Sequence, residues 1–133
     1  MARRLSLNAL TTLFIVAGAL HFILTPYYMH MMPSFLSWHR SLVLVSGACE
    51  IAGGAGLLIP ATRRLAALGL IALLIAVFPA NVTMALGAER FVAAGHAWVL
   101  WLRLPLQFVL IAWIWWAAAG KPQHKCPYFG ENA

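Results

Sequence analysis

Residues 44–60 read LVSGACEIAGGAGLLIP, a run with the length and hydrophobicity of a membrane-crossing helix. It is apolar or small throughout except for a carboxylate at Glu50, which is one of three acids in the whole chain. Its length is close to the ~20 residues that a helix needs to cross a bilayer. The stretch therefore predicts a transmembrane helix that carries a charge, and that charge needs an explanation.

The composition argues against an ordinary soluble domain. Of the 133 residues, 63% are hydrophobic and 9% are charged, whereas an average globular domain has roughly 25% charged residues. The alternative, a soluble all-α core, does not account for apolar stretches long enough to span lipid. The net charge of +6 suggests a nucleic-acid partner, but the basic residues flank the apolar stretches instead of forming a patch with interleaved aromatic residues. We therefore predict a membrane protein with no nucleic-acid partner.

Hydropathy divides the chain into four apolar stretches joined by short connections. The predicted spans are about Leu5–Thr25, Ser41–Ile59, Leu65–Leu86 and Ala97–Ala118. Lipid offers the backbone no hydrogen bonds, so these spans should be helices. The predicted fold class is all-α: an integral membrane four-helix bundle formed by residues 1–120 and surrounded by the lipid bilayer, followed by a polar tail at residues 121–133.

The basic residues outside the spans predict the orientation. Six basic residues are predicted to lie on one side of the membrane: Arg3, Arg4, Arg63, Arg64, Lys121 and Lys125. Only Arg40 and Arg90 are predicted to lie on the other side. By the positive-inside rule, both termini are then cytoplasmic. For the first span, a cleavable signal peptide with a small-residue site at residues 17–19 is the alternative, and the sequence leaves it open.

Strongly polar residues within the predicted spans are few. They are His21, Glu50, Asn81, Arg103 and Gln107, and they come from all four spans. At ~1.5 Å of rise per residue, all five lie between the membrane mid-plane and roughly 9 Å outside it. The sequence therefore predicts one polar layer in the outer half of the bundle, and these five residues are the predicted ligand-binding residues.

Glu50 is expected to face the interior of the bundle. A lone charge at the bilayer centre costs about 2.5–3.5 kcal/mol on insertion scales, and a buried partner lowers that cost. Small residues on the same helix face, including Gly47 and Gly54, allow a neighbouring helix to approach closely. Arg103 is the predicted ion-pair partner, and Gln107, one turn further on, could hydrogen-bond the pair. A buried ion pair that only fixes helix register is the alternative interpretation.

Two further features favour a functional site for a polar headgroup, a quinone or a proton. Pro79 and Pro105 each free a helical carbonyl beside the polar layer. His21 adds a side chain that titrates near neutral pH.

No metal site is predicted. His124 and Cys126 are too sparse for zinc, and the stretch YYMHMM (residues 27–32), whose thioethers and imidazole would suit Cu(I), is better explained as an apolar interfacial loop. Cys49 and Cys126 lie far apart and at different depths, so no disulfide or dithiol redox centre is expected.

Three segments resemble the DoxX family of small bacterial membrane proteins. They are SGACEIAGGAGLLIPATRRLAA (residues 46–67), AVFPANVTMA (residues 76–85) and WLRLPLQ (residues 101–107). The resemblance is good over about residues 12–86. It implies a four-helix bundle in the bacterial cytoplasmic (inner) membrane and an association with quinone-linked redox chemistry. It does not supply a flavin, haem or iron–sulfur ligand set, so a quinone is the one cofactor class that it suggests.

The leading functional hypothesis is a non-catalytic, DoxX-like accessory protein that binds a quinone or lipid and serves a membrane or peripheral oxidoreductase subunit. The second is a small quinone-linked membrane enzyme, in which His21 acts as acid or base and Arg103 holds an anionic or carbonyl group. The third is a proton or small-solute carrier. The sequence does not identify the catalytic residues, the ligand or the oligomeric state.

Overall fold

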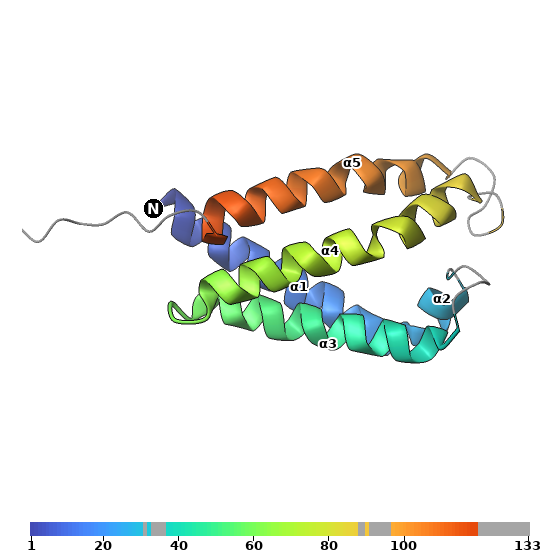
Figure 1. Cartoon of the computed structure of the whole chain (residues 1–133), viewed down its shortest axis with the longest axis horizontal. Helices are drawn as coiled ribbons and strands as arrows, with labels where there is room; N and C mark the ends of the chain where they lie inside the picture. The colour runs from blue at the N-terminus through green and yellow to red at the C-terminus, as the bar shows by residue number, and fades with distance from the viewer. Residues whose placement is uncertain (31, 33–36, 88–89, 91–96, 120–133) are drawn as a thin grey trace, which may run out of the picture.

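The structure is a computed structural model that describes residues 1–30, 32, 37–87, 90 and 97–119, and this part of the chain is helical and contains no strand. The long helices are α1 (Ala2–Ile23), α3 (His39–Leu58), α4 (Arg63–Leu86) and α5 (Ala97–Ile114). A short helix, α2 (Thr25–His30), follows α1, and a π-helical turn, η2 (Trp115–Ala119), extends α5. Figure 1 shows these helices as one elongated bundle.

The four long helices coincide with the four predicted apolar stretches to within a few residues. Each is long and apolar enough to cross a membrane. The all-α prediction is therefore confirmed for the described residues. The polar tail predicted at residues 121–133 lies outside them, and so does Cys126, whereas Cys49 is exposed on α3.

The end of α1 was not predicted to continue into a second helix. The hydroxyl of Thr25 donates to the carbonyl oxygens of His21 (2.7 Å) and Phe22 (2.9 Å), so it satisfies two groups that the end of α1 leaves unpaired. Pro26 then occupies the first turn of α2, where its missing N–H is harmless. As a result, the chain turns and α2 packs against α3.

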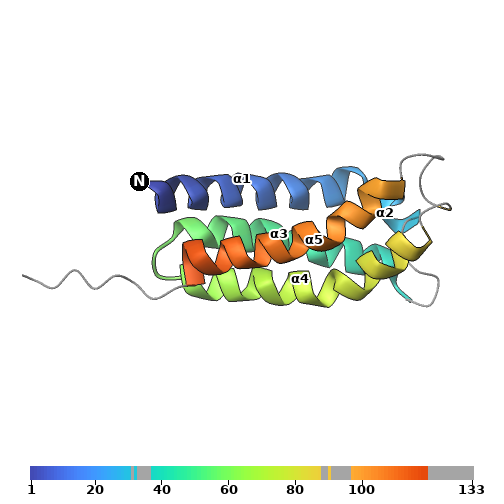
Figure 2. The ribbon, with the colours of Figure 1, turned by 90° about the horizontal axis from the view of Figure 1, so that it is seen from above.

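The long helices associate as two pairs. Helix α1 packs along α3, and α4 packs along α5, with α3 and α4 joining the pairs. The pairs converge at the end that carries the N-terminus and the α3–α4 turn, and they diverge toward the end that carries α2 (Figure 1). Figure 2 shows the same helices from above, running lengthwise between these two ends. We refer to these as the N-terminal end and the α2 end of the bundle.

The hydrophobic core fills the N-terminal end. Its buried members come from all four long helices and η2: Leu7, Leu10, Phe14, Leu57, Ala67, Leu70, Ile114 and Ala117. A small second cluster, Ala85 and Leu100, joins α4 to α5 near the α2 end. Because most of the buried apolar side chains lie at one end, the other end has room for polar residues and a cavity.

Glycines bring α1 and α3 into close contact. A Cβ atom added to Gly18 would lie 2.6 Å from the carbonyl oxygen of Gly47, and one added to Gly47 would lie 2.7 Å from the Cβ of His21. Such small-residue contacts are the usual means of close helix packing in membranes, where van der Waals contact drives association. Gly47 and Gly54, which the sequence assigned to helix packing, therefore have that role, and the contact of Gly47 with His21 holds His21 against α3.

Thr11→Val tests a hydrogen bond across this interface. The buried Thr11 hydroxyl donates to the carbonyl oxygen of Gly54 at 3.0 Å. Valine keeps the shape but not the donor, so we expect a loss of about 1 kcal/mol in the free energy of unfolding. Thermal unfolding in detergent measures it. Thr12→Val, at the exposed neighbouring position, is the control, and equal unfolding temperatures for the two variants would contradict the assignment.

Candidate functional site

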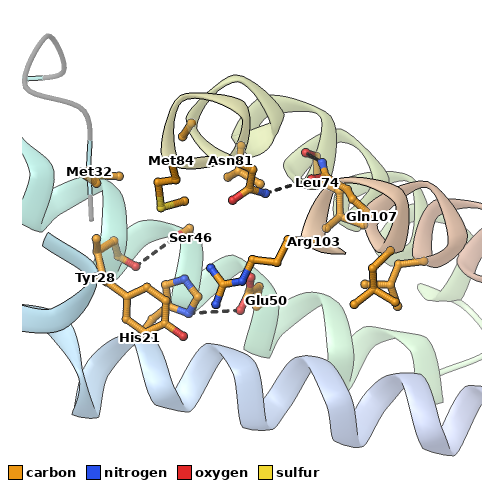
Figure 3. Close-up of a pocket in the computed structure, with 15 residues that line it drawn as sticks. His21, Tyr28, Met32, Ser46, Glu50, Leu74, Asn81, Met84, Arg103 and Gln107 are labelled. Atoms are coloured by element: carbon orange, nitrogen blue, oxygen red, sulfur yellow. Dashed lines mark hydrogen bonds and ion pairs between the residues drawn. The ribbon is translucent and has the colours of Figure 1, made fainter. Parts of the chain in front are cut away.

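A cavity of about 270 Å³ lies between the two helix pairs toward the α2 end. All five residues of the predicted polar layer line it: His21, Glu50, Asn81, Arg103 and Gln107 (Figure 3). Apolar side chains, including Leu74 and Leu110, line much of the remainder. The structure thus brings together polar side chains from four helices that lie far apart in the sequence.

One wall of the cavity is formed by the α1–α3 pair. His21 Nδ1 lies 3.4 Å from Glu50 Oε2, and these side chains are 17% and 15% exposed. The same nitrogen lies 2.8 Å from the carbonyl oxygen of Ala17. A carbonyl only accepts, so Nδ1 carries the proton and the other ring nitrogen, Nε2, remains available to a ligand.

Glu50 has a different ionisable partner from the one predicted. Among the described residues, His21 lies within ion-pair distance of Glu50, and Arg103 does not. The physical reason is the packing: the glycine contacts hold α1 close to α3, whereas Arg103 lies on α5, in the pair that diverges from α3. Glu50 Oε2 is buried and has no hydrogen-bond partner in the described structure.

The α4–α5 pair forms the opposite wall. Asn81 Nδ2 donates to Gln107 Oε1 at 2.9 Å, and Gln107 Nε2 donates to the carbonyl oxygen of Leu74. Gln107 is 4% exposed, so both bonds are shielded from solvent. This network joins α4 to α5. Gln107 was expected to hydrogen-bond Glu50 and Arg103, but in the structure its amide bonds α4 instead.

The prolines that were expected to open the helices lie inside continuous helices. Pro79 is within α4 and Pro105 within α5. Pro79 supplies no N–H to the carbonyl one turn earlier, and the Gln107 amide bonds the neighbouring carbonyl of Leu74. The hydroxyl of Thr83 donates to the carbonyl oxygen of Pro79 at 2.9 Å. Side chains therefore supply local hydrogen bonds around the proline in α4.

Arg103 extends from α5 into the cavity, toward His21 and Glu50 (Figure 3). Its guanidinium forms no hydrogen bond or ion pair with any described residue. A guanidinium offers five N–H donors in a planar fork that suits carboxylate and phosphate oxygens. The cavity thus presents strong donors that the described part of the protein does not use.

Tyr28 is a cavity residue that the sequence analysis missed. Its ring stacks on the His21 imidazole, with centroids 4.3 Å apart and an interplanar angle of 12°. Burial raises the pKa of the Tyr28 phenol, Glu50 and Tyr27 raise it further, and the charge of Arg103 opposes the rise. The phenol therefore stays protonated at neutral pH. No helical spacing from His21 indicates it in the sequence, because α1 ends at Ile23 and Tyr28 lies on α2.

In the described residues, the fold and cavity are those of a small helical protein with four helices long and apolar enough to cross a membrane and a polar cavity between two helix pairs. The chain belongs to the family described as Domain of unknown function (DUF8561), which matches residues 10–118. No curated protein and no solved structure matches the chain.

The family match shows that the resemblance to DoxX is wrong. The three segments that suggested DoxX all lie within residues 10–118. They combine small residues, a pair of arginines at the start of α4 and prolines inside apolar helices. Closely packed membrane helices commonly combine small interfacial residues with basic connections, so this pattern does not distinguish one family of small membrane bundles from another.

Proposed function

We propose that the chain is a multi-pass membrane protein that binds the polar headgroup of a bilayer-soluble amphiphile, a lipid or a quinone, in its cavity. In this proposal the protein binds its ligand without transforming it. An oxidoreductase partner is not included, because that expectation came from the DoxX resemblance.

The exposed surface of the helices supports membrane insertion. Large apolar side chains are exposed on each of the four long helices, including Val16 on α1, Val45 on α3, Ile75 on α4 and Phe108 on α5. Soluble monomers rarely expose contiguous apolar surface on such a scale. Lipid would cover these side chains without cost.

The distribution of arginines supports the orientation. Arg3 and Arg4 begin α1 and Arg63 and Arg64 begin α4, so these four residues lie at the N-terminal end of the bundle (Figure 1). The positive-inside rule places that end in the cytoplasm. The cavity then lies toward the outer face of the membrane.

One observation carries the binding proposal: the Arg103 guanidinium enters the cavity without a partner among the described residues. A charge in apolar surroundings costs several kcal/mol unless it is paired, and unpaired intramembrane charges mark ligand or ion sites. A volume of about 270 Å³ is close to the lower end of small-molecule pockets, ~300 Å³. The cavity therefore fits a headgroup, with apolar chains left in the bilayer.

Arg103→Met tests this proposal. Removing hydrogen bonds from a charged donor typically costs about 1.5–3 kcal/mol, so we expect retention of the ligand to fall roughly 10- to 100-fold. Native mass spectrometry of protein extracted in mild detergent, and of protein in nanodiscs supplied with lipid or quinone, measures retention.

Arg90→Met is the matched control, because Arg90 is exposed and outside the cavity. It should retain the ligand as the wild type does. If the wild type binds neither lipids nor quinones, or if Arg103→Met binds them equally well, the proposal is wrong.

A further inference from the structure

The cavity has opposite charges on opposite walls. Glu50 lies on α3 and Arg103 on α5, and the two do not come within ion-pair distance. Their separation leaves each able to bind a different part of one ligand. The ligand should also donate a hydrogen bond to Glu50 Oε2, because this atom is buried and has no hydrogen-bond partner among the described residues.

Apart from the Tyr28 phenol, which can both donate and accept, the remaining polar atoms on the Glu50 side are acceptors. His21 donates from Nδ1 to Ala17, so in the neutral ring Nε2 is an acceptor. The hydroxyl of Ser46, which also lines the cavity, donates to the carbonyl oxygen of Val43 at 2.9 Å, and its lone pairs remain available. A ligand group at this wall should therefore be a positively charged donor with several N–H bonds.

The ligand group beside Arg103 should be an anion that accepts hydrogen bonds. The Arg103 guanidinium has N–H donors and no acceptor, and it recognises phosphate through two parallel hydrogen bonds. The charges of Glu50 and Arg103 sum to zero, so the cavity is complementary to a dipolar headgroup and not to a net anion or cation.

Resting on the proposed function, we infer that the ligand is a zwitterionic aminophospholipid with a primary ammonium. The phosphate binds Arg103, and the ammonium binds Glu50 with help from Nε2 of His21. The three N–H bonds of a primary ammonium satisfy the carboxylate that the protein leaves without a hydrogen bond. The acyl chains extend from the cavity into the bilayer.

Other amphiphiles satisfy this site less well. A quinone offers carbonyl acceptors to Arg103 but no donor to Glu50. A quaternary ammonium lipid has the right charges but no N–H bond, and an anionic lipid brings no cation to the carboxylate. The first two leave Glu50 Oε2 buried and without a hydrogen bond, and the anionic lipid leaves the Glu50 carboxylate without a counter-ion; either is costly for a charged group.

The test compares lipids with identical acyl chains on the wild-type protein in nanodiscs. Native mass spectrometry should show phosphatidylethanolamine retained at least about tenfold more than phosphatidylglycerol or phosphatidylcholine, and more than a quinone. Adding methyl groups one at a time to the ethanolamine nitrogen should lower retention stepwise. This series needs no variant, so it decides the question even if substitutions in the cavity prevent folding.

Glu50→Gln provides the second measurement. The amide keeps the shape and removes the charge, so preference for phosphatidylethanolamine over phosphatidylglycerol should fall to within about twofold. Asn8→Ala, at an exposed position on α1 outside the cavity, should keep the wild-type preference. A preference that persists in folded Glu50→Gln overturns the role of Glu50.

The outcomes separate this inference from the proposed function. If the wild type binds a quinone, phosphatidylglycerol or phosphatidylcholine as well as it binds phosphatidylethanolamine, the inference is overturned and the binding function stands. If no amphiphile binds, both are overturned. The ethanolamine preference in the wild type, together with its loss in Glu50→Gln, supports both.

Discussion

Gly18→Ala is expected to destabilise the protein by about 1–3 kcal/mol or more, the usual cost of overpacking a tight interface. The new Cβ would lie 2.6 Å from the carbonyl oxygen of Gly47 and 2.7 Å from Cγ1 of Ile51. The first of these is a backbone atom, which cannot move without separating α1 from α3. A fall in the thermal unfolding temperature in detergent measures the effect.

Gly69→Ala is the matched control for this substitution. A Cβ at Gly69, on α4, meets nothing within 4 Å. Alanine favours an isolated helix over glycine by ~1 kcal/mol, so this variant should be as stable as the wild type or more stable. Equal losses of stability in both variants would mean that the close α1–α3 contact does not stabilise the fold.

Because that contact also positions His21 against Glu50, Gly18→Ala should weaken ligand retention as well.

Leu10→Ala should destabilise the protein by about 2–5 kcal/mol, the range for removing a fully buried leucine side chain. Leu10 is 0% exposed and belongs to the core at the N-terminal end of the bundle. In lipid the association of helices depends on van der Waals packing, and a new void removes those contacts directly. Thermal or denaturant-induced unfolding in detergent measures the change.

Leu106→Ala is the comparison for Leu10→Ala. Leu106 is 50% exposed and lines the cavity at the α2 end, so its removal enlarges a space that already exists. Its cost should be much smaller than that of Leu10→Ala. Similar costs at the two positions would contradict the division of the bundle into a packed N-terminal end and an open α2 end.

The fold was predictable because a long apolar helix can be recognised from its own segment of sequence. Each span is a continuous run, and the length of a helix across a bilayer is fixed by its rise per residue. Helix α2 was not predictable from hydropathy, since it has only six residues and its start depends on the hydrogen bonds of Thr25 to the end of α1.

Five of the polar residues that line the cavity, those of the predicted polar layer, were predictable for a related reason. Polar side chains are rare inside apolar helices, so each is noticeable, and its depth follows from its position along the span. The partner of each was not predictable. Arg103 was the evident partner of Glu50 by charge, but His21 occupies that position because glycines allow α1 to approach α3. Gln107 is bonded instead to Asn81 and Leu74 on α4.

The amino-acid sequence was enough to predict the long helices, their approximate limits and the polar residues that they carry. Hydrophobicity and helical rise are properties of local segments, so no knowledge of the packing was needed. The tertiary structure alone decided which of those polar residues pair and which face the cavity unpaired. Pairing depends on distances between helices, and side-chain volume at the contacts sets those distances. Gly18 and Gly47 face each other and bring α1 into contact with α3. Among the described residues, the side chains of Glu50 and Arg103 instead line a cavity.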